Sequence, residues 1–490
     1  SVILTASTSS NDPVKLAGEI ARDRGRVVVV GAVKMDIPRE HYYMKELELC
    51  LSRSYGPGRY DPSYEEWGFD YPIGYVRWTE KRNMEEVLRL MAAGKLNVEL
   101  LTTNEFKIDD AAAAYDMILG KTATSGSVCG VLLKYDVEGE VLSRIATKYA
   151  KSGADKNKIG VGFIGAGNFA TASLLPHLRS HSSVLLTGLA NSTGVSAKNT
   201  AERFRFNFCA SSSREVIEDS STDCVFIATR HNLHAPIVVE ALSKGRSVFV
   251  EKPLCLNEEE LKQIVAAYKT GKEPALLVGF NRRFSPLALQ LKKALGHKTT
   301  PYSILYRVNA GFIAKNSWIQ DPIQGGGRIV GEVCHFIDLM QYFTDAEPVR
   351  VFAESITTGS DKETDEDTVA ITVKFSDGSV GTVHYIAVGD KSFPKEYIEI
   401  FGSGTVAVLD DFKSASLTKN GSTTKFGGSS QDKGHKDEVQ GFIDEIIKNN
   451  SSTIQFRSLV ATTLATFKAV ESLRSGKTEV VELDRLLDGF

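Results

Sequence analysis

A glycine-rich turn carries the clearest chemical signal in this chain of 490 residues. Gly165, Gly167 and Ala170 form the pattern G-x-G-x-x-A, directly after an apolar run and at the start of a helical pattern. The first glycine permits a tight turn, the second lets the backbone approach a pyrophosphate, and the small third residue lets helix and strand pack closely. Free N–H groups at the helix start attract the anion. We therefore expect Gly165, Gly167, Asn168 and Phe169 to contact a dinucleotide.

The residues about one strand further on bear on which dinucleotide is bound. An acidic side chain normally binds the ribose diol of NAD about twenty residues after the glycine turn. This chain has Asn191 and Ser192 there, so no carboxylate repels a 2′-phosphate. Lys198 and Arg203 lie nearby in the sequence and would attract one, which favours NADP slightly over NAD. The alternative is that Asn191 hydrogen-bonds the diol and NAD is used.

Four further polar clusters make a family resemblance specific. In order and spacing they resemble the glucose–fructose oxidoreductase / inositol dehydrogenase family, over about residues 158–490. That resemblance implies an oxidoreductase that binds NAD or NADP. The clusters are Thr229–His234, Glu251–Pro253, Gly279–Phe284 and Gly331–Asp338, the last of which follows the triple glycine 325–327.

The resemblance also implies the roles of two residues. Lys252 is expected between the nicotinamide and the substrate, before a Lys–Pro bond that is often cis in the family. An ammonium beside a sugar hydroxyl favours the alkoxide that develops as hydride leaves. His335 is expected to be the general base, because a histidine near its ordinary pKa takes a hydroxyl proton at neutral pH. Lys252 and His335 are therefore the predicted catalytic residues.

Matching positions carry over further contacts. The expected cofactor contacts are Thr229, Arg230, His231, His234, Glu251, Lys252 and Arg282. The expected substrate contacts are Trp318, Asn309, Asp321 and Glu332.

The chain departs from the family pattern at one position beside the predicted base. Many members carry an aspartate four residues before the histidine, where this chain has Gly331. Glu332 lies on one helix face with His335 and is one substitute for the missing carboxylate. Asp338, three residues past the histidine, is the other candidate to orient its ring.

The pattern of apolar runs predicts the architecture that must position these residues. Residues 158–285 alternate strands and helices in the rhythm of a doubly wound, parallel Rossmann sheet. Residues 286–490 read as an α+β domain with a large, open antiparallel sheet, which serves substrate binding and oligomerisation. Its expected strands are 302–309, 349–356, 368–375, 380–385, 396–401 and 405–410, with helices at 331–343 and 436–449.

The N-terminal part reads differently. Residues 1–135 resemble the second half of a medium-chain, alcohol-dehydrogenase-like unit, and a lysine-rich linker follows at 136–157. We expect a partial α/β fold here without a complete cofactor site or a zinc site. The chain opens inside a strand-like run, so we expect an upstream portion to precede it, and an unpaired sheet edge to need a partner.

Composition narrows the class of protein further. A net charge of −3 argues against a nucleic-acid or membrane partner. The six scattered cysteines have no metal-ligand spacing and favour a reducing, cytoplasmic setting. The open sheet favours a homo-oligomer.

The sequence thus predicts an NAD(P)-dependent enzyme that transfers hydride from a secondary hydroxyl of a sugar or nucleotide sugar. The alternative is a dinucleotide-binding sensor or scaffold without catalysis, which the missing aspartate at Gly331 keeps open. A related reduction, of the dihydrodiol or biliverdin type, is a third possibility.

Overall fold

The structure is a computed structural model, and its chain forms two compact units, Ser1–Glu140 and Val141–Phe490. The division falls inside the segment 136–157 that the sequence indicates as a linker. The structure describes the whole chain except residues 66–67, 123–125, 127, 136–142, 151–157, 272, 358–363, 428–429, 449–452 and 489–490. Among the described residues, no helix has both the length and the apolar character needed to cross a membrane.

The first unit contains two small parallel sheets, as the alternating pattern predicts. Strands β1, β2 and β3 pair in parallel, and α1 and α2 help to enclose a core that includes Val14, Val27 and Tyr42. Strands β4 and β5 form the second parallel pair. The elements are β1 (Val2–Leu4), α1 (Asp12–Ile20), β2 (Arg26–Val29), α2 (Arg39–Met44), β3 (Glu48–Leu51), α3 (Pro62–Glu65), α4 (Glu80–Ala92), β4 (Thr102–Lys107), α5 (Ala111–Ile118) and β5 (Gly130–Lys134). Its resemblance to half of a medium-chain dehydrogenase stays a prediction.

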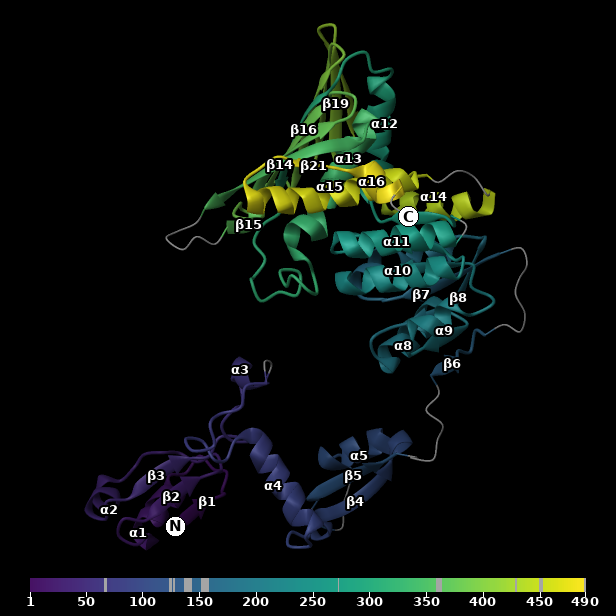
Figure 1. Cartoon of the computed structure of the whole chain (residues 1–490). Coiled ribbons are helices and arrows are strands. Elements are labelled where there is room, and N and C mark those ends of the chain that lie inside the picture. Colours follow the sequence, from purple (N-terminus) through teal and green to yellow (C-terminus); the bar gives the residue numbers. More distant parts are fainter. Residues whose placement is uncertain are drawn as a thin grey trace. The chain divides into compact units, whose positions relative to one another are not determined.

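The second unit begins with a sheet of seven strands in the order β12-β11-β10-β7-β8-β9-β6. All neighbours from β12 to β9 are parallel, so the predicted Rossmann sheet is confirmed. Figure 1 shows helices α10 and α11 side by side along this sheet. The elements are β7 (Ile159–Ile164), α6 (Asn168–Ser173), α7 (Leu175–Ser180), β8 (Val184–Ala190), α8 (Gly194–Phe204), β9 (Phe208–Ala210), α9 (Ser213–Ile217), β10 (Cys224–Ile227), α10 (His234–Ser243), β11 (Ser247–Val250), α11 (Glu258–Thr270) and β12 (Leu276–Val278).

Aromatic packing fixes the three central strands of this sheet. Phe163, Phe226 and Phe249 are in register on β7, β10 and β11, and all three are fully buried. Their rings stack with centroids 6.0 and 4.6 Å apart, and Phe442 of α14 (His435–Lys448) meets two of them edge-on. The strand ends that carry the candidate residues therefore project from a rigid core.

Part of the predicted linker is a strand. Residues Arg144–Ala146 form β6, which pairs antiparallel with β9 at the sheet edge. The free backbone groups of β9 supply the hydrogen bonds, and the Arg144 guanidinium lies 3.5 Å from the Phe208 ring centroid and 2.6 Å from a carboxylate oxygen of Asp219. A short polar strand of this kind has no apolar alternation, which is why composition alone indicates a linker.

The rest of the second unit is built on a nine-stranded sheet in the order β20-β19-β18-β17-β13-β16-β15-β14-β21. The expected large sheet is confirmed, and its pairs are antiparallel except that β13 runs parallel to β16. A parallel pair needs a long crossover, and the chain between these strands supplies one that includes α13. The elements are α12 (Pro286–Leu295), β13 (Ser303–Asn309), α13 (Cys334–Thr344), β14 (Pro348–Thr357), β15 (Thr364–Phe375), β16 (Val380–Ile386), β17 (Glu396–Gly402), β18 (Thr405–Asp410), β19 (Ser414–Lys419), β20 (Ser422–Gly427), α15 (Phe456–Ser475), β21 (Glu479–Val480) and α16 (Leu483–Asp488).

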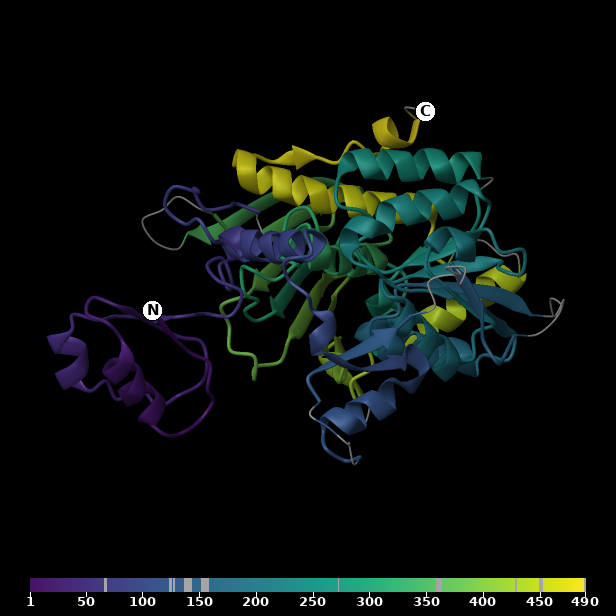
Figure 2. The ribbon, with the colours of Figure 1, turned by 90° about the horizontal axis from the view of Figure 1, so that it is seen from below.

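Helix α15 is the longest element that sequence reasoning missed. It contacts β14 and α13 of the sheet part and α11 of the Rossmann part, and Figure 2 shows it running beside both. Most of its residues are buried, including Thr462, Thr463 and Thr466. A helix that is buried nearly all round shows no amphipathic stripe, so its period is hard to detect in the sequence.

A buried ion pair joins the two parts of this unit. Arg282, in the turn Asn281–Phe284 after β12, donates from Nε and Nη2 to the two carboxylate oxygens of Glu396 on β17, at 2.7 and 3.0 Å. Lys433 and Tyr306 donate to the same carboxylate, at 2.7 and 2.6 Å. The surrounding positive charges outweigh burial and hold the pKa of Glu396 far below its ordinary value.

Removing the carboxylate of Glu396 tests the contribution of this buried ion pair to stability. Glu396→Gln leaves the buried Arg282 and the partly buried Lys433 without a counter-charge, and we expect a loss of about 3–5 kcal/mol in unfolding free energy. Urea unfolding measures it, with Glu399→Gln on the same strand as the control. An unfolding midpoint equal to that of the control would contradict the role of the pair.

Candidate active site

The glycine turn has the shape that a diphosphate needs. Gly165 has a φ of +87°, and a Cβ there would lie 2.6 Å from Cγ2 of Thr229 and 2.7 Å from the backbone of Ala228. A Cβ on Gly167 would meet nothing within 4 Å, so the backbone there faces open space. The turn therefore packs tightly on the neighbouring strand and leaves room above the start of α6 for the phosphates of a dinucleotide.

The end of β8 presents an amide where NAD-specific sites present a carboxylate. The side chain of Asn191 donates to Oγ of Ser196 at 2.7 Å and accepts from the backbone N–H of Ser192 at 3.1 Å. Thr193 caps α8 by accepting from the N–H of Ser196. Lys198 on the same helix is exposed. This strand end carries no negative charge of its own to oppose a 2′-phosphate.

His234 holds two loops together rather than facing a ligand. Its fully buried ring lies between the carbonyls of Pro253, at 2.7 Å, and Thr229, at 3.2 Å. Burial lowers the pKa of this histidine to about 4, so the ring is neutral at pH 7. The structure therefore gives His234 a positioning role, and its expected contact with the cofactor stays a prediction. The Lys252–Pro253 bond beside it is cis, as the resemblance implies.

Lys252 and the stretch before His335 meet at the end of β11. Nζ of Lys252 donates to the carbonyl of Gly331 at 3.1 Å. That glycine lies in a π-helical turn over Ile329–Val333, which leads directly into α13. Single π turns inside helices recur at functional sites, because the extra residue changes which groups face outward.

His335 is a neutral, buried imidazole. Only 5% of its surface is exposed, and its Nδ1 has no hydrogen-bonding partner. Burial, together with the charges of Arg282 and Lys252, holds its pKa well below 6.5. This corrects the expectation of a histidine near its ordinary pKa, while the neutral ring remains able to accept a proton at pH 7.

Neither predicted substitute for the missing aspartate orients this ring. Glu332 accepts from Nζ of Lys395 at 2.5 Å and from the hydroxyl of Tyr385. Burial opposes its charge, but the charges of Lys395 and Lys252 outweigh it and lower the pKa to about 2. Asp338 is buried in an ion pair with Arg283, whose Nε donates to it at 2.8 Å.

Four other residues that the sequence predicts for the site form contacts with other groups of the chain. Arg282 forms the buried pair with Glu396, and its expected contact with a cofactor stays a prediction. Nδ2 of Asn309 donates to the carbonyl of Asp390 at 2.6 Å. The carboxylate of Asp321 accepts from two backbone N–H groups of its own loop, at 2.7 and 3.0 Å. Trp318 meets the ring of His231 edge-on, with centroids 4.9 Å apart.

The structure also reveals one acidic group, Glu438, that the sequence did not single out, beside Glu251, an expected cofactor contact. Glu438, in the first turn of α14, is fully buried, and both of its carboxylate oxygens lack a hydrogen-bonding partner. Glu251 is also buried, and burial raises its pKa to about 7. The signal in the sequence was weak, because an acidic residue in the first turn of a helix is an ordinary capping feature.

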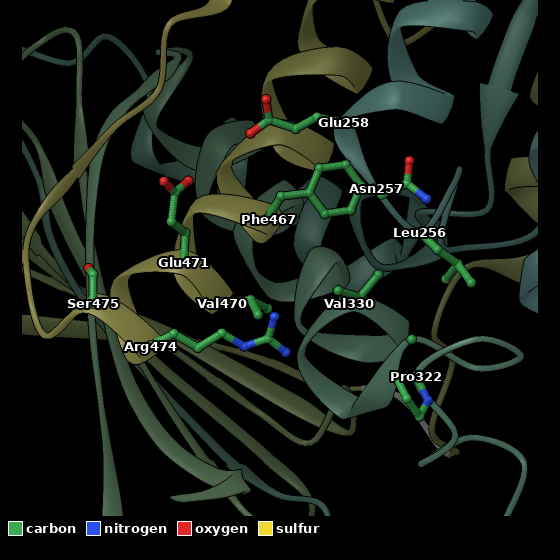
Figure 3. A pocket seen from close by; sticks show the side chains of 11 residues that line it. Leu256, Asn257, Glu258, Pro322, Val330, Phe467, Val470, Glu471, Arg474 and Ser475 are labelled. Atoms are coloured by element: carbon green, nitrogen blue, oxygen red, sulfur yellow. The ribbon is translucent and has the colours of Figure 1, made fainter.

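A pocket of about 580 Å³ lies behind the π turn. Figure 3 shows Val330 of that turn together with Leu256, Pro322 and Phe467 around this space. Neither Lys252 nor His335 lines it, so it is separate from the place where the two candidate catalytic groups lie.

Comparisons with known proteins show which proteins this chain is similar to. Residues 159–280 match the family model described as "Oxidoreductase family, NAD-binding Rossmann fold", and residues 299–407 match the "GFO/IDH/MocA C-terminal domain". Myo-inositol 2-dehydrogenase of Thermotoga maritima is 26% identical over 247 residues, which are 50% of this chain and 72% of that protein. The putative oxidoreductase YceM of Salmonella typhimurium is 34% identical over 136 residues, 28% of this chain and 43% of that protein.

Solved structures share the fold. A levoglucosan dehydrogenase in complex with NADH and levoglucosan aligns with a TM-score of 0.58 and 20% identity, over 66% of this chain and all of that one. An oxidoreductase domain protein from Kribbella flavida aligns with a TM-score of 0.60 and 19% identity, over 66% of this chain and 99% of that one.

The amide at the end of β8 yields a direct test of cofactor choice. Asn191→Asp places a carboxylate where a 2′-phosphate would lie, so we expect NADPH affinity to fall on the order of tenfold while NADH affinity holds or improves. Fluorescence titration with each dinucleotide measures this, and Asn199→Asp adds the same charge elsewhere on α8 as the control. If both variants bind NADPH equally well, the ribose does not lie at Asn191.

Proposed function

Because the unit Val141–Phe490 belongs to the Gfo/Idh/MocA family of oxidoreductases, we propose that it reversibly oxidises a secondary hydroxyl of a sugar or polyol. Bound NAD or NADP would supply the hydride acceptor. The observation that carries the proposal is the meeting of Lys252 with the π turn that leads into His335. It brings one ammonium and one neutral imidazole to the carboxyl end of a parallel sheet, where ligands of such folds bind.

Each group has a defined part in this reaction. The ammonium of Lys252 would stabilise negative charge on the hydroxyl oxygen as its C–H bond breaks. The neutral ring of His335 would accept the hydroxyl proton, since its depressed pKa leaves it unprotonated at pH 7. Gly165 and Gly167 would hold the diphosphate that brings the nicotinamide to these groups.

The names of the relatives support the substrate class. Myo-inositol 2-dehydrogenase, 1,5-anhydro-D-fructose reductase and levoglucosan dehydrogenase all act on cyclic polyols or anhydrosugars by name. We extend the proposal to nucleotide sugars, whose secondary hydroxyls present the same chemistry. Asn191 and the exposed Lys198 favour NADP slightly, whereas NADH occurs in the solved complexes of relatives.

Removing the ammonium tests the proposal. We expect Lys252→Ala to lower kcat/KM for the best sugar by on the order of 100- to 1000-fold, because the developing alkoxide loses its stabilising charge. Lys262→Ala, a partly exposed lysine on α11, is the matched control. A fluorescence titration with NADH checks that the Lys252→Ala variant still binds the cofactor. A Lys252→Ala enzyme with full turnover would refute the proposed chemistry, and tight dinucleotide binding without turnover on any sugar would favour a sensor.

The depressed pKa of His335 sets the pH dependence. A base must be unprotonated to act, and lowering its pKa extends the unprotonated range toward acid. We therefore expect kcat/KM for sugar oxidation to stay level as the pH falls through 6.5, and to decline only well below it. A steady-state profile from about pH 5 to pH 8 measures this. A half-maximal rate near 6.5 would show that another, ordinary histidine is the base.

A further inference from the structure

Gly331 is a glycine for a steric reason. Its backbone is helical, within the π turn, so no left-handed conformation requires glycine there. A Cβ built on it would lie 3.0 Å from Cε1 and 3.4 Å from Nδ1 of His231. The ring of His231 therefore occupies the space that any side chain at position 331 would enter. The two positions form an exchanged pair, in which the loop after β10 supplies the side chain and the helix position carries none.

Several contacts fix the direction of that imidazole. Nδ1 of His231 lies 2.8 Å from the carbonyl of Gly325, which accepts only, so Nδ1 carries the proton. The N–H of Asn232 donates to the carbonyl of Gln324 at 3.1 Å, and Arg230 bonds the side chain of Gln324. Three consecutive residues of one loop, 230–232, thus hydrogen-bond to residues 324 and 325 of the loop that leads to the π turn. These contacts are called the clasp below.

The chemistry of the remaining nitrogen follows from this clasp. Burial and the charge of Lys252 lower the pKa of His231 to about 3, so the ring is neutral at pH 7. With its single proton on Nδ1, the ring has an unprotonated Nε2 that accepts hydrogen bonds and donates none. The residue retains 7% of its surface exposed. Lys252 bonds the carbonyl of the same Gly331 against which this ring lies.

We infer that His231 is a specificity-determining residue, whose Nε2 accepts a hydrogen bond from the substrate at the carbon next to the one that is oxidised. The site would then select vicinal diols, because a deoxy, keto or O-methyl group at that carbon has no proton to donate. This inference rests on the proposed function and deepens it by naming the substrate class.

Two amide variants separate the two ring nitrogens. An asparagine amide reaches the place of Nδ1, and a glutamine amide reaches the place of Nε2. Probes are inositol, glucose and levoglucosan, followed by the monodeoxy and mono-O-methyl analogues of whichever is turned over fastest. We expect His231→Asn to keep the clasp but raise KM for the diol on the order of tenfold, more than it lowers kcat. His231→Gln should retain the preference for the diol over its deoxy analogue.

One outcome of this comparison would overturn the inference. If His231→Asn discriminates between diol and deoxy sugar as well as the unaltered enzyme does, the histidine serves structure alone. A fall in melting temperature or in NADH affinity without a change in discrimination has the same meaning.

A stability cycle tests the exchanged pair without any substrate. Gly331→Ala should lower the melting temperature by about 3 °C in the unaltered protein, since the new Cβ crowds the ring. In a His231→Ala background the same change should be neutral or stabilising, as Gly→Ala is in ordinary helices. Equal effects in both backgrounds would overturn the pair. If no sugar is turned over while the cycle behaves as expected, the proposed function fails and the exchanged pair stands.

Discussion

The hydrogen bond from Lys252 to the carbonyl of Gly331 is the contact on which the candidate site depends. It brings the end of a Rossmann strand to the turn that begins the main helix of the sheet domain. The ammonium is held beside a turn whose next helical residues include the neutral, buried His335. An ammonium and a neutral imidazole are thereby placed at the same edge of the parallel sheet, where the glycine turn leaves its backbone open.

Buried charges elsewhere serve to keep this edge in place. Arg282 and Arg283 are neighbours in the turn after β12. Arg282 forms an ion pair with Glu396 and Arg283 forms one with Asp338, and both carboxylates belong to the sheet domain. Such pairs contribute little net stability, because desolvation offsets their attraction, but breaking one leaves an uncompensated charge. Their role is to fix how the two domains of the unit meet, and so to fix where Lys252 lies relative to α13.

The sequence predicted what depends on local pattern. The glycine turn and the alternation of strands and helices after residue 158 agree with the structure, as does the cis bond at Lys252 that the resemblance implies. The features that the sequence did not predict depend on contacts between residues far apart in the chain. The partner of Arg282 lies 114 residues away, and α15 hides its period because it is buried almost all round. Gly331 read as a lost aspartate, and only its distance to His231, from another loop, gives it a steric reason.

A structure with bound dinucleotide would test the central claim most directly. Crystals grown with NADPH or NADH should place the diphosphate over Gly165 and Gly167, and the nicotinamide ring beside Nζ of Lys252 on the side that faces His335. A dinucleotide bound elsewhere, or a nicotinamide ring whose reactive face is separated from Lys252 by protein, would contradict it.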